Sequence, residues 1–455
     1  MKYPLSIFLT GLTFIVNAQN DSSTIRKIYD YHLTQSNTYK NEEYLATKIG
    51  GRLSGSPQAA KAVEWAKKAM YEAGADTVYL IPCMVPHWVR GEKEQCKLSS
   101  VKLKKNTKLN ICALGGSVAT APNGITAEVI EVTSFDDLKK LGADKVKGKI
   151  VFYNSPMEPT YLHTGKAYGE AVKYRWGGAS EAAKYGAIAS ITRSVTLALN
   201  DSPHTGAMGY DSTAAKIPAC AISTIAAAEL SESLKKDPTL KLFVKTSCKT
   251  LADEPSFSVV GEIKGSDKPE EIILVGGHLD SWDTGQGAHD DGTGVVQSIE
   301  ILAGFKKLGL KPKRTIRAVA FMNEENGGRG GKSYADLSKK NKLQHIAAIE
   351  SDAGGFTPRG MGIEADNNVV DNFKRWQNLF TPYDINITKG GGGADINYLK
   401  EQGTICMSLS PDSQRYFDFH HTPDDTFDKV NKRELELGSA TMNAFIYLLD
   451  KYGVK

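Results

Sequence analysis

The spacing of apolar residues changes along the chain and predicts different elements in different regions. Between about residues 22 and 74, apolar side chains recur every three or four positions, as they do in helices. A glycine- and serine-rich stretch at residues 50–56 interrupts this pattern and predicts a turn. Residues 77–81 then favour a strand. We therefore expect the chain to begin with helices, followed by a strand.

Residues 114–248 show a different pattern, in which short β-rich runs alternate with helices. The β-rich runs are residues 127–132, 149–153 and 187–192, and the predicted helices are the alanine-rich residues 178–185 and residues 225–234. A segment of this length has the size of a domain. We predict that it is a β-rich domain inserted into the surrounding fold.

After this segment, buried strands end directly in polar residues. The apolar run at residues 271–275 leads into His278, residues 315–322 lead into Asn323, and residues 345–350 lead into Ser351. A helix is predicted over residues 292–308, with Gly309 placed to end it. Strands that alternate with helices predict an α/β fold with an open, mostly parallel sheet, whose ligand sites lie at the carboxyl ends of the strands.

Length and composition describe a globular chain with more than one domain. The 455 residues exceed an ordinary domain, and 41% hydrophobic with 24% charged residues is typical of soluble proteins. The net charge of +4 is small and the lysines are dispersed, which argues against nucleic acid or an acidic membrane as partner. Six cysteines without a CxxC pair indicate neither a thiolate metal site nor a redox motif.

The first 18 residues have the composition of a secretory signal peptide. Lys2 precedes an apolar run over residues 4–16, and Val16-Asn17-Ala18 offers small residues for cleavage. The run is too short to span a bilayer, although an uncleaved tether is the alternative. We expect a mature chain that begins near Gln19 and is exported to the periplasm or the extracellular medium.

Four short segments concentrate imidazole and carboxylate groups. They are His278-Leu279-Asp280 with Asp290, Glu324-Glu325, Asp352, and residues 420–426 (HHTPDDT). Mixed histidine and carboxylate ligands suit zinc, and a single catalytic zinc uses three protein ligands. The larger number available here predicts two zinc ions that share a bridging carboxylate, as in sites used for hydrolysis.

Two of these segments suggest a division of roles. Adjacent residues at a strand end point in different directions, so one of Glu324 and Glu325 can bind metal while the other faces the attacking water as general base. Asp280, two residues after His278, is placed to accept the second N–H of that imidazole.

The motifs HLDSW…GAHDDGTG, NEENGGRG, ESDAGG and HHTPDDT resemble those of the co-catalytic zinc exopeptidases, which include secreted bacterial aminopeptidases and glutamate carboxypeptidases. The resemblance is greatest to the carboxypeptidase Q-like branch and extends from the GRLSGS turn (residues 51–56) through the mature chain. It implies a three-layer zinc-exopeptidase fold with a protease-associated (PA-like) insert. The implied division is a signal peptide (1–18), a catalytic domain in two parts (19–113 and 249–455) and the insert (114–248).

The same resemblance implies roles for individual residues. Asp290 would bridge two zinc ions, of which one is completed by His278 and Asp352 and the other by Glu325 and His421. Glu324 would be the general base and Asp280 the orienter of the histidine. The family pattern favours Asp290 over Asp291, which is also placed as a helix N-cap. His289 departs from the pattern and is expected to be an exposed loop histidine, not a ligand.

Several residues stay open as substrate contacts. In the family that this sequence resembles, a loop comparable to residues 390–395 lies beside the substrate, which suggests Gly392, Gly393 and Asp395 as substrate contacts. His420 is a further candidate, although it is also placed to pack against the site or to support a ligand residue. From the insert, Arg193, His204 and Thr205 are candidates to reach the cleft, although structural roles suit them equally.

We therefore predict a secreted metallo-exopeptidase that hydrolyses small peptides, such as dipeptides or peptide termini, by metal-activated water with Glu324 as base. Aminopeptidase and carboxypeptidase or dipeptidase specificities remain open, and no arginine for a substrate carboxylate can be placed. Two alternatives share the fold: a non-catalytic receptor, which predicts lost ligands, and a single-zinc glutaminyl cyclase-like transferase, which needs no bridge. A homodimer also remains open.

Overall fold

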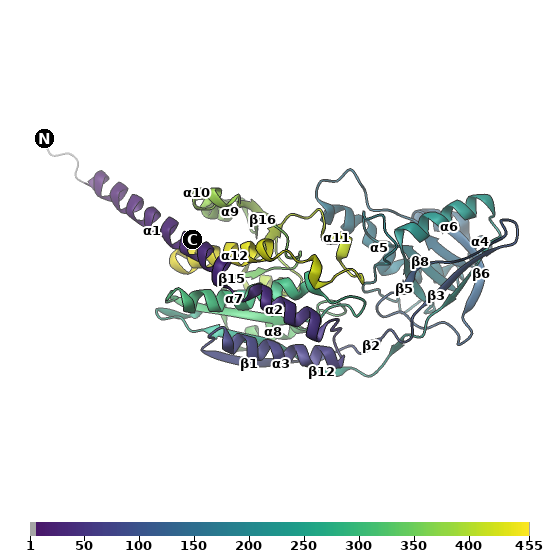
Figure 1. Cartoon of the computed structure of the whole chain (residues 1–455), viewed down its shortest axis with the longest axis horizontal. Coiled ribbons are helices and arrows are strands. Elements are labelled where there is room, and N and C mark those ends of the chain that lie inside the picture. Colours follow the sequence, from purple (N-terminus) through teal and green to yellow (C-terminus); the bar gives the residue numbers. More distant parts are fainter. Residues whose placement is uncertain (1–5, 455) are drawn as a thin grey trace.

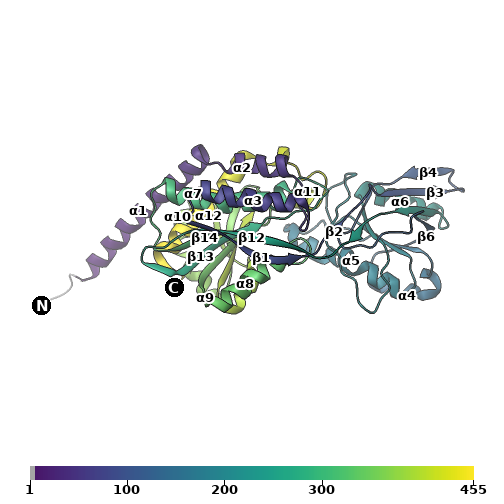
Figure 2. The same ribbon diagram turned by 90° about the horizontal axis from the view of Figure 1, so that it is seen from below.

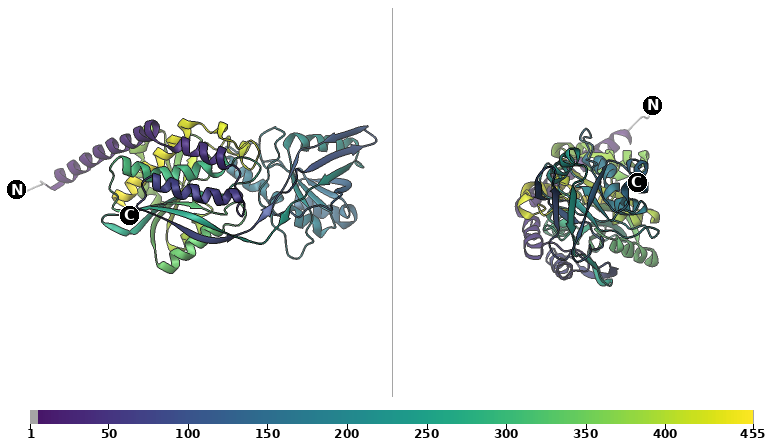
Figure 3. Two further views of the ribbon diagram at one scale, coloured as in Figure 1. Left: turned by 60° about the horizontal axis from the view of Figure 1, so that its bottom comes forward. Right: turned by 90° about the vertical axis from the view of Figure 1, so that its right-hand side faces the viewer.

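The computed structural model describes residues 6–454, with side chains from Asn20 onward. Two lobes lie end to end, and helix α1 (Ser6–Gln35) extends from the main lobe away from the second one (Figure 1 and Figure 3). The predicted signal peptide falls partly on residues 1–5, outside the described residues, so its cleavage stays a prediction. Within residues 6–454, no helix has the length and apolar character needed to cross a membrane.

The main lobe is built on an eight-stranded sheet in the order β1-β12-β14-β13-β15-β18-β16-β17. The bounds are β1 Thr77–Val85, β12 Glu254–Ile263, β13 Lys268–His278, β14 Arg314–Phe321, β15 Gln344–Glu350, β16 Pro358–Glu364, β17 Asn386–Lys389 and β18 Ile405–Pro411. The four central strands, β14, β13, β15 and β18, run parallel, and antiparallel pairs flank them. The predicted α/β fold with a parallel centre is confirmed.

Helices cover both faces of this sheet, which explains why its central strands are apolar along their length. On one face lie α2 (Thr38–Tyr44), α3 (Pro57–Glu72), α7 (Thr293–Lys307) and α12 (Lys432–Tyr452), and on the other lies α8 (Arg329–Asn341) (Figure 2). Every residue of β14 is buried, as is α7 from Thr293 to Phe305. The lobe therefore has three layers, and α7 is a core helix rather than a surface one.

The second lobe has its own eight-stranded sheet, in the order β4-β3-β10-β6-β7-β8-β9-β5. Its strands are β3 Gln95–Ser100, β4 Lys105–Lys108, β5 Ile111–Ala113, β6 Ile125–Val132, β7 Ile150–Tyr153, β8 Ala189–Arg193, β9 Ala219–Ile222 and β10 Lys241–Lys245. Helices α4 (Phe135–Val146), α5 (Thr164–Lys184) and α6 (Thr224–Lys236) accompany them. The predicted helix at residues 178–185 is only the last part of α5.

The boundary of the insert differs from the prediction. Strands β3, β4 and β5 pair within the second sheet, so the inserted lobe begins near Gln95 instead of Leu114. The β3 strand alternates exposed and buried residues, as an antiparallel strand with one wet face does. The boundary is set by the sheet in which these strands pair, which composition does not show.

The lobes meet at a small apolar junction beside the two-stranded link of β2 (Trp88–Val89) and β11 (Lys249–Thr250). Leu53, Trp88, Ala113, Cys248 and Trp282 form one buried cluster there. Gly115 lies so close to Trp282 that an added Cβ atom would stand 1.7 Å from the indole ring. Only glycine fits at this position without moving Trp282.

Gly115→Ala is therefore expected to destabilise the protein by about 1–3 kcal/mol, the usual cost of overpacking a core. Gly169 on the exposed side of α5 has no atom within 4 Å of an added Cβ atom and is the matched control. Gly169→Ala should raise stability by about 0.5–1 kcal/mol through helix propensity. Thermal unfolding of both variants measures the contrast, and equal stability for the two would contradict the tight junction.

Candidate active site

The four sequence motifs meet at the carboxyl edge of the main sheet. His278 is the last residue of β13, Glu324 and Glu325 follow β14, and Asp352 follows β15. Asp290 lies in the turn Ala288–Gly292 that precedes α7, and His420 and His421 follow the short helix α11 (Tyr416–Phe419). With residues of the inserted lobe, most of these side chains line a cavity of about 630 Å³. The location agrees with the rule that parallel sheets bind ligands at their carboxyl ends.

The Asp290 carboxylate stands at the centre of this group. Its Oδ1 lies 3.2 Å from Nε2 of His278, and its Oδ2 lies 3.1 Å from Nε2 of His421. His278 Nε2 is also 3.4 Å from Asp352, and His421 Nε2 is 3.1 Å from Glu325. The two oxygens of one buried carboxylate thus face two separate sets of ligand atoms.

The electrostatics of the site show a concentration of negative charge. Burial and the carboxylates of Asp352 and Glu325 raise the pKa of Glu324 well above its usual range. Burial and the neighbouring Asp290 raise the pKa of Glu325 to about 7. Burial alone would also raise the pKa of Asp290, but hydrogen bonds from His278 and His421 hold it well below its usual range. The histidines therefore compensate Asp290, whereas Glu324 and Glu325 lack enough positive charge around them.

The donor set fits divalent metal ions. His278, Asp290 and Asp352 form one group whose ligand atoms lie within 4.8 Å of one another, and Asp290, His420 and His421 form another. Glu325 Oε1 is buried without a hydrogen-bond donor, which costs free energy unless a cation or water satisfies it. Histidine and carboxylate together are ligands that zinc accepts.

Neighbouring groups hold the Asp290 turn in place. The carboxylate of Asp425 accepts hydrogen bonds from the backbone N–H groups of His289, at 2.7 Å, and of Asp290, at 3.2 Å. Asp291 accepts from the N–H of His278 and from that of Gly294 in the first turn of α7. Asp291 thus satisfies a helix N-terminus, the alternative to bridging that its position suggested.

Asp280 acts differently from the sequence prediction. Nδ1 of His278 lies 3.0 Å from the backbone carbonyl of Asp280 and 4.0 Å from its carboxylate. The carboxylate instead accepts hydrogen bonds from the N–H groups of Asn323, at 2.7 Å, and Glu324, at 3.0 Å. The imidazole is oriented by backbone, because the turn after β13 brings the carbonyl closer than the side chain, while the Asp280 side chain fixes the Glu324 loop.

His289 is buried, contrary to the expectation of an exposed loop residue. Its ring stacks on Phe356 at 4.3 Å and on Phe419 at 5.5 Å, and its Nδ1 accepts a hydrogen bond from Gly355 N–H. Burial lowers its pKa to about 4, so the ring is neutral. The aromatic partners lie far away in sequence, which is why the local pattern suggested a surface position.

The two consecutive histidines of the last motif stack on each other, with ring centroids 3.4 Å apart. His420 Nε2 is 3.7 Å from Asp290, against 3.1 Å for His421, and only His421 also reaches Glu325. Burial and the adjacent His421 keep the pKa of His420 well below its usual value. The geometry places His421 closer than His420 to the candidate ligand set.

The glycine-rich loop contacts the site less directly than expected. Of its residues, Ala394 lines the cavity, whereas Gly392, Gly393 and Asp395 do not belong to the described lining. An added Cβ atom at Gly393 would stand 2.1 Å from the Glu350 carboxylate, so glycine is required there by a buried acid. Asp395 is buried with both carboxylate oxygens lacking hydrogen-bond partners.

Sequence reasoning missed two groups that the structure brings to this region. Asp425 was visible in the HHTPDDT motif, but its bonds to a turn 135 positions away gave no local signal. Arg175 of α5 lies on the cavity wall, although no arginine could be placed there from sequence. Of the three insert candidates, Thr205 donates its N–H to the backbone carbonyl of His421, while Arg193 lies outside the described lining.

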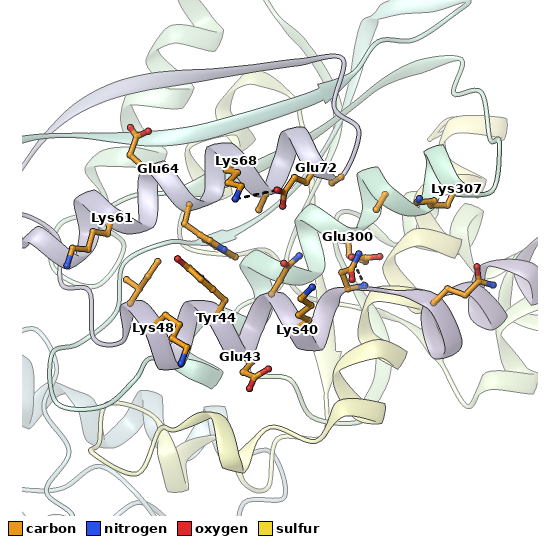
Figure 4. A pocket seen from close by; sticks show the side chains of 18 of the residues that line it. Lys40, Glu43, Tyr44, Lys48, Lys61, Glu64, Lys68, Glu72, Glu300 and Lys307 are labelled. Atoms are coloured by element: carbon orange, nitrogen blue, oxygen red, sulfur yellow. Dashed lines mark hydrogen bonds and ion pairs between the residues drawn. The ribbon is translucent and has the colours of Figure 1, made fainter.

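A larger hollow, of about 1230 Å³, lies elsewhere on the main lobe, between α2, the turn after it, and α3 (Figure 4). Its walls carry lysine and glutamate side chains in alternation, including an ion pair between Lys68 and Glu72. None of the described residues that line it belongs to the four motifs. The chemistry therefore points to the smaller cavity between the lobes.

Comparisons with known proteins agree with this site. The model of peptidase family M28 matches residues 258–446, which contain all four motifs. Carboxypeptidase Q of Bos taurus is 39% identical over 421 residues, covering 92% of this chain and 86% of that protein.

Among solved structures, a peptidase M28 precursor from Shewanella amazonensis is 33% identical, with a TM-score of 0.90, and the match covers 95% of this chain and 97% of that one. A zinc aminopeptidase from Bacillus subtilis shares the fold, with 21% identity, a TM-score of 0.64 and coverage of 90% and 94%. The resemblance predicted from the motifs is confirmed: the chain belongs to peptidase family M28 and is a metallo-exopeptidase.

Proposed function

We propose that the chain is an exported exopeptidase that binds two zinc ions and hydrolyses small peptides. The observation that carries the proposal is the Asp290 carboxylate, whose two oxygens lie 3.2 and 3.1 Å from the Nε2 atoms of His278 and His421. A carboxylate so placed suits a bridging ligand. His278 and Asp352 would hold one ion, and Glu325 and His421 the other.

The charges of the proposed site balance. Two zinc ions contribute about +4, and the three ligand carboxylates contribute about −3, so one hydroxide would leave the centre near neutrality. This explains how Asp290, Glu325 and Asp352 can be crowded into a buried site without an arginine or lysine among them. The carbonyl of Asp280 holds Nδ1–H of His278, which leaves Nε2 free as the ligand atom.

Zinc bound here would supply a Lewis acid for the peptide carbonyl and would lower the pKa of the attacking water. Glu324 lines the cavity and is held by the hydrogen bond from its N–H to Asp280. We assign it as the general base that takes a proton from the water and passes it to the leaving amine. Burial and the neighbouring carboxylates raise the pKa of Glu324, a direction that favours holding the proton taken from the water until it is passed on.

The name of the bovine relative and the contribution of the inserted lobe to the cavity wall favour short substrates with a free carboxylate. Part of the cavity wall comes from the inserted lobe, including Gly115 and Trp176, so the cavity is bounded by both lobes. Such an enclosure suits dipeptides or the last residues of a peptide better than a long chain. Export is proposed from the predicted signal peptide.

The two adjacent glutamates test the proposal. The zinc-loaded protein should hydrolyse dipeptides, and Glu324→Gln should lower kcat by about 10²–10⁴ because the general base is lost. Its zinc content and thermal stability should stay close to those of the parent protein. Glu325→Gln should lose zinc as well as activity, because a ligand is weakened.

Metal analysis and peptide hydrolysis are measured on the same preparations of both variants. If Glu324→Gln empties a site while Glu325→Gln stays fully loaded and inactive, the assigned roles are reversed. If the loaded parent protein hydrolyses no dipeptide and chelation changes nothing, the proposed activity is wrong.

Asp425 offers a separate test through the turn that it holds. Asp425→Asn replaces one acceptor oxygen by an N–H₂ group that faces the N–H of His289 or Asp290, so the turn should shift and zinc affinity should fall by about 10–100-fold. Asp424→Asn is the matched control, since Asp424 accepts from Ser202 of the inserted lobe and not from the Asp290 turn. Competition with a zinc chelator measures both affinities, and equal losses would contradict the role given to Asp425.

A further inference from the structure

Arg175 is a buried cation in a cavity that is otherwise acidic. It projects from α5 of the inserted lobe and is 7% exposed. Within the described lining of the cavity it is the only lysine or arginine, whereas Asp290, Glu324, Glu325 and Asp352 supply four carboxylates. The guanidinium therefore stands where an anionic part of a substrate would find its one fixed positive charge.

The guanidinium has more donors than acceptors around it. Of its five N–H groups, one on Nη2 donates to the Tyr168 hydroxyl at 2.7 Å, and one on Nη1 makes a long contact of 3.5 Å with the carbonyl of Thr205. Nε is buried without a partner. No aspartate or glutamate among the described residues forms an ion pair with Arg175.

The remaining contact of Arg175 does not satisfy it either. Nη1 lies 3.4 Å from Nδ1 of His421, which is itself 3.3 Å from the carbonyl of Thr205. When Nε2 of His421 faces a metal ion, the ring proton sits on Nδ1 and is donated to that carbonyl. Arg175 and His421 then both have N–H donors at this contact, so the contact is not a hydrogen bond for the guanidinium.

A buried charge without a counterion is costly, so its retention calls for a compensating ligand. A carboxylate fits, because the planar fork of arginine binds two carboxylate oxygens at once. Tyr168 adds a second donor: its oxygen accepts from Arg175, which leaves its own O–H hydrogen available. The Tyr168 ring is held by stacking on Phe417 at 4.5 Å.

The position of Arg175 also sets the length of the substrate. Nη1 of Arg175 lies at the Nδ1 edge of the His421 ring. The opposite edge of that ring carries Nε2, which faces Asp290 and Glu325, so one imidazole ring separates Arg175 from these carboxylates. In a dipeptide the scissile carbonyl carbon and the carboxylate carbon are three bonds apart, which is about 4 Å. Each further residue would move the carboxylate by roughly 3.3–3.6 Å.

We propose that Arg175, assisted by Tyr168, binds the free α-carboxylate of the residue whose amine leaves. This inference rests on the proposed peptidase function and narrows it to dipeptidase or carboxypeptidase specificity. The inserted lobe thus contributes the group that selects the carboxyl end of the substrate. Arg175 is a specificity-determining residue and takes no part in proton transfer.

The test compares a dipeptide with its C-terminal amide, for which we choose alanyl-leucine and alanyl-leucinamide. The zinc-loaded protein should prefer the free acid, and Arg175→Gln should lower kcat/KM for alanyl-leucine by about 10–100-fold, mainly through KM, while changing the amide by less than about threefold. Arg175→Lys should fall between, because it keeps the charge and loses the fork. Arg193→Gln, in the same lobe but outside the described lining, should behave as the parent protein.

Binding of the same two compounds to the Glu324→Gln holoprotein, measured by calorimetry, separates this inference from the proposed activity. Tighter binding of the free acid than of the amide supports the carboxylate site even if the parent protein hydrolyses neither. Equal binding of the two overturns it, even if both are hydrolysed. If Arg175→Gln does not fold, the acid-to-amide preference of the parent protein decides alone. Equal losses on both compounds in a folded Arg175→Gln protein assign Arg175 to the lobe junction and overturn the proposal.

Discussion

The sharing of the Asp290 carboxylate between two histidines is the constraint on which the rest of the site depends. Its two oxygens must face His278 and His421 at once, although these residues come from a central strand and from a loop more than 140 positions later. A buried carboxylate cannot be held so without support from hydrogen bonds. Asp425 binds the backbone of the Asp290 turn, and Asp291 ties the same turn to His278 and to α7. Helix α7 packs in the core under the sheet, which makes this turn rigid. The carboxylate of Asp290 is therefore held rigidly as well.

Much of this arrangement could be predicted from the sequence, because the central strands are recognisable as apolar runs. Buried runs that lead into His278, Asn323 and Ser351 leave a parallel sheet as the simplest fold, and parallel strands present their carboxyl ends at one edge. The surplus of carboxylates over what one ion needs then favours a paired metal site. Arg52 of the GRLSGS turn shows why that motif also belongs to the site. Its buried guanidinium donates to the backbone carbonyls of Leu279, Gln286 and Gly287 and so holds the loop between His278 and Asp290.

What the sequence could not show are contacts set by tertiary packing. Both the backbone carbonyl and the carboxylate of Asp280 lie near the His278 imidazole, and the carbonyl accepts its hydrogen bond because the turn brings it closer. Sequence spacing does not reveal this turn geometry. The local sequence around His289 is typical of an exposed loop, but in the structure its ring stacks on Phe356 and Phe419. Arg175 is the largest omission. It sits on a helix of the inserted lobe, without a motif, and becomes part of the cavity only because the two lobes face each other across it.

Anomalous diffraction at the zinc absorption edge, from crystals of the zinc-loaded protein, tests most directly the proposal that Asp290 bridges two zinc ions. We predict two anomalous peaks of similar height on opposite sides of the Asp290 carboxylate. One peak should be bound by His278 and Asp352, and the other by His421 and Glu325. A single peak in a fully active preparation, or a second ion held by His420 in place of His421, would contradict it.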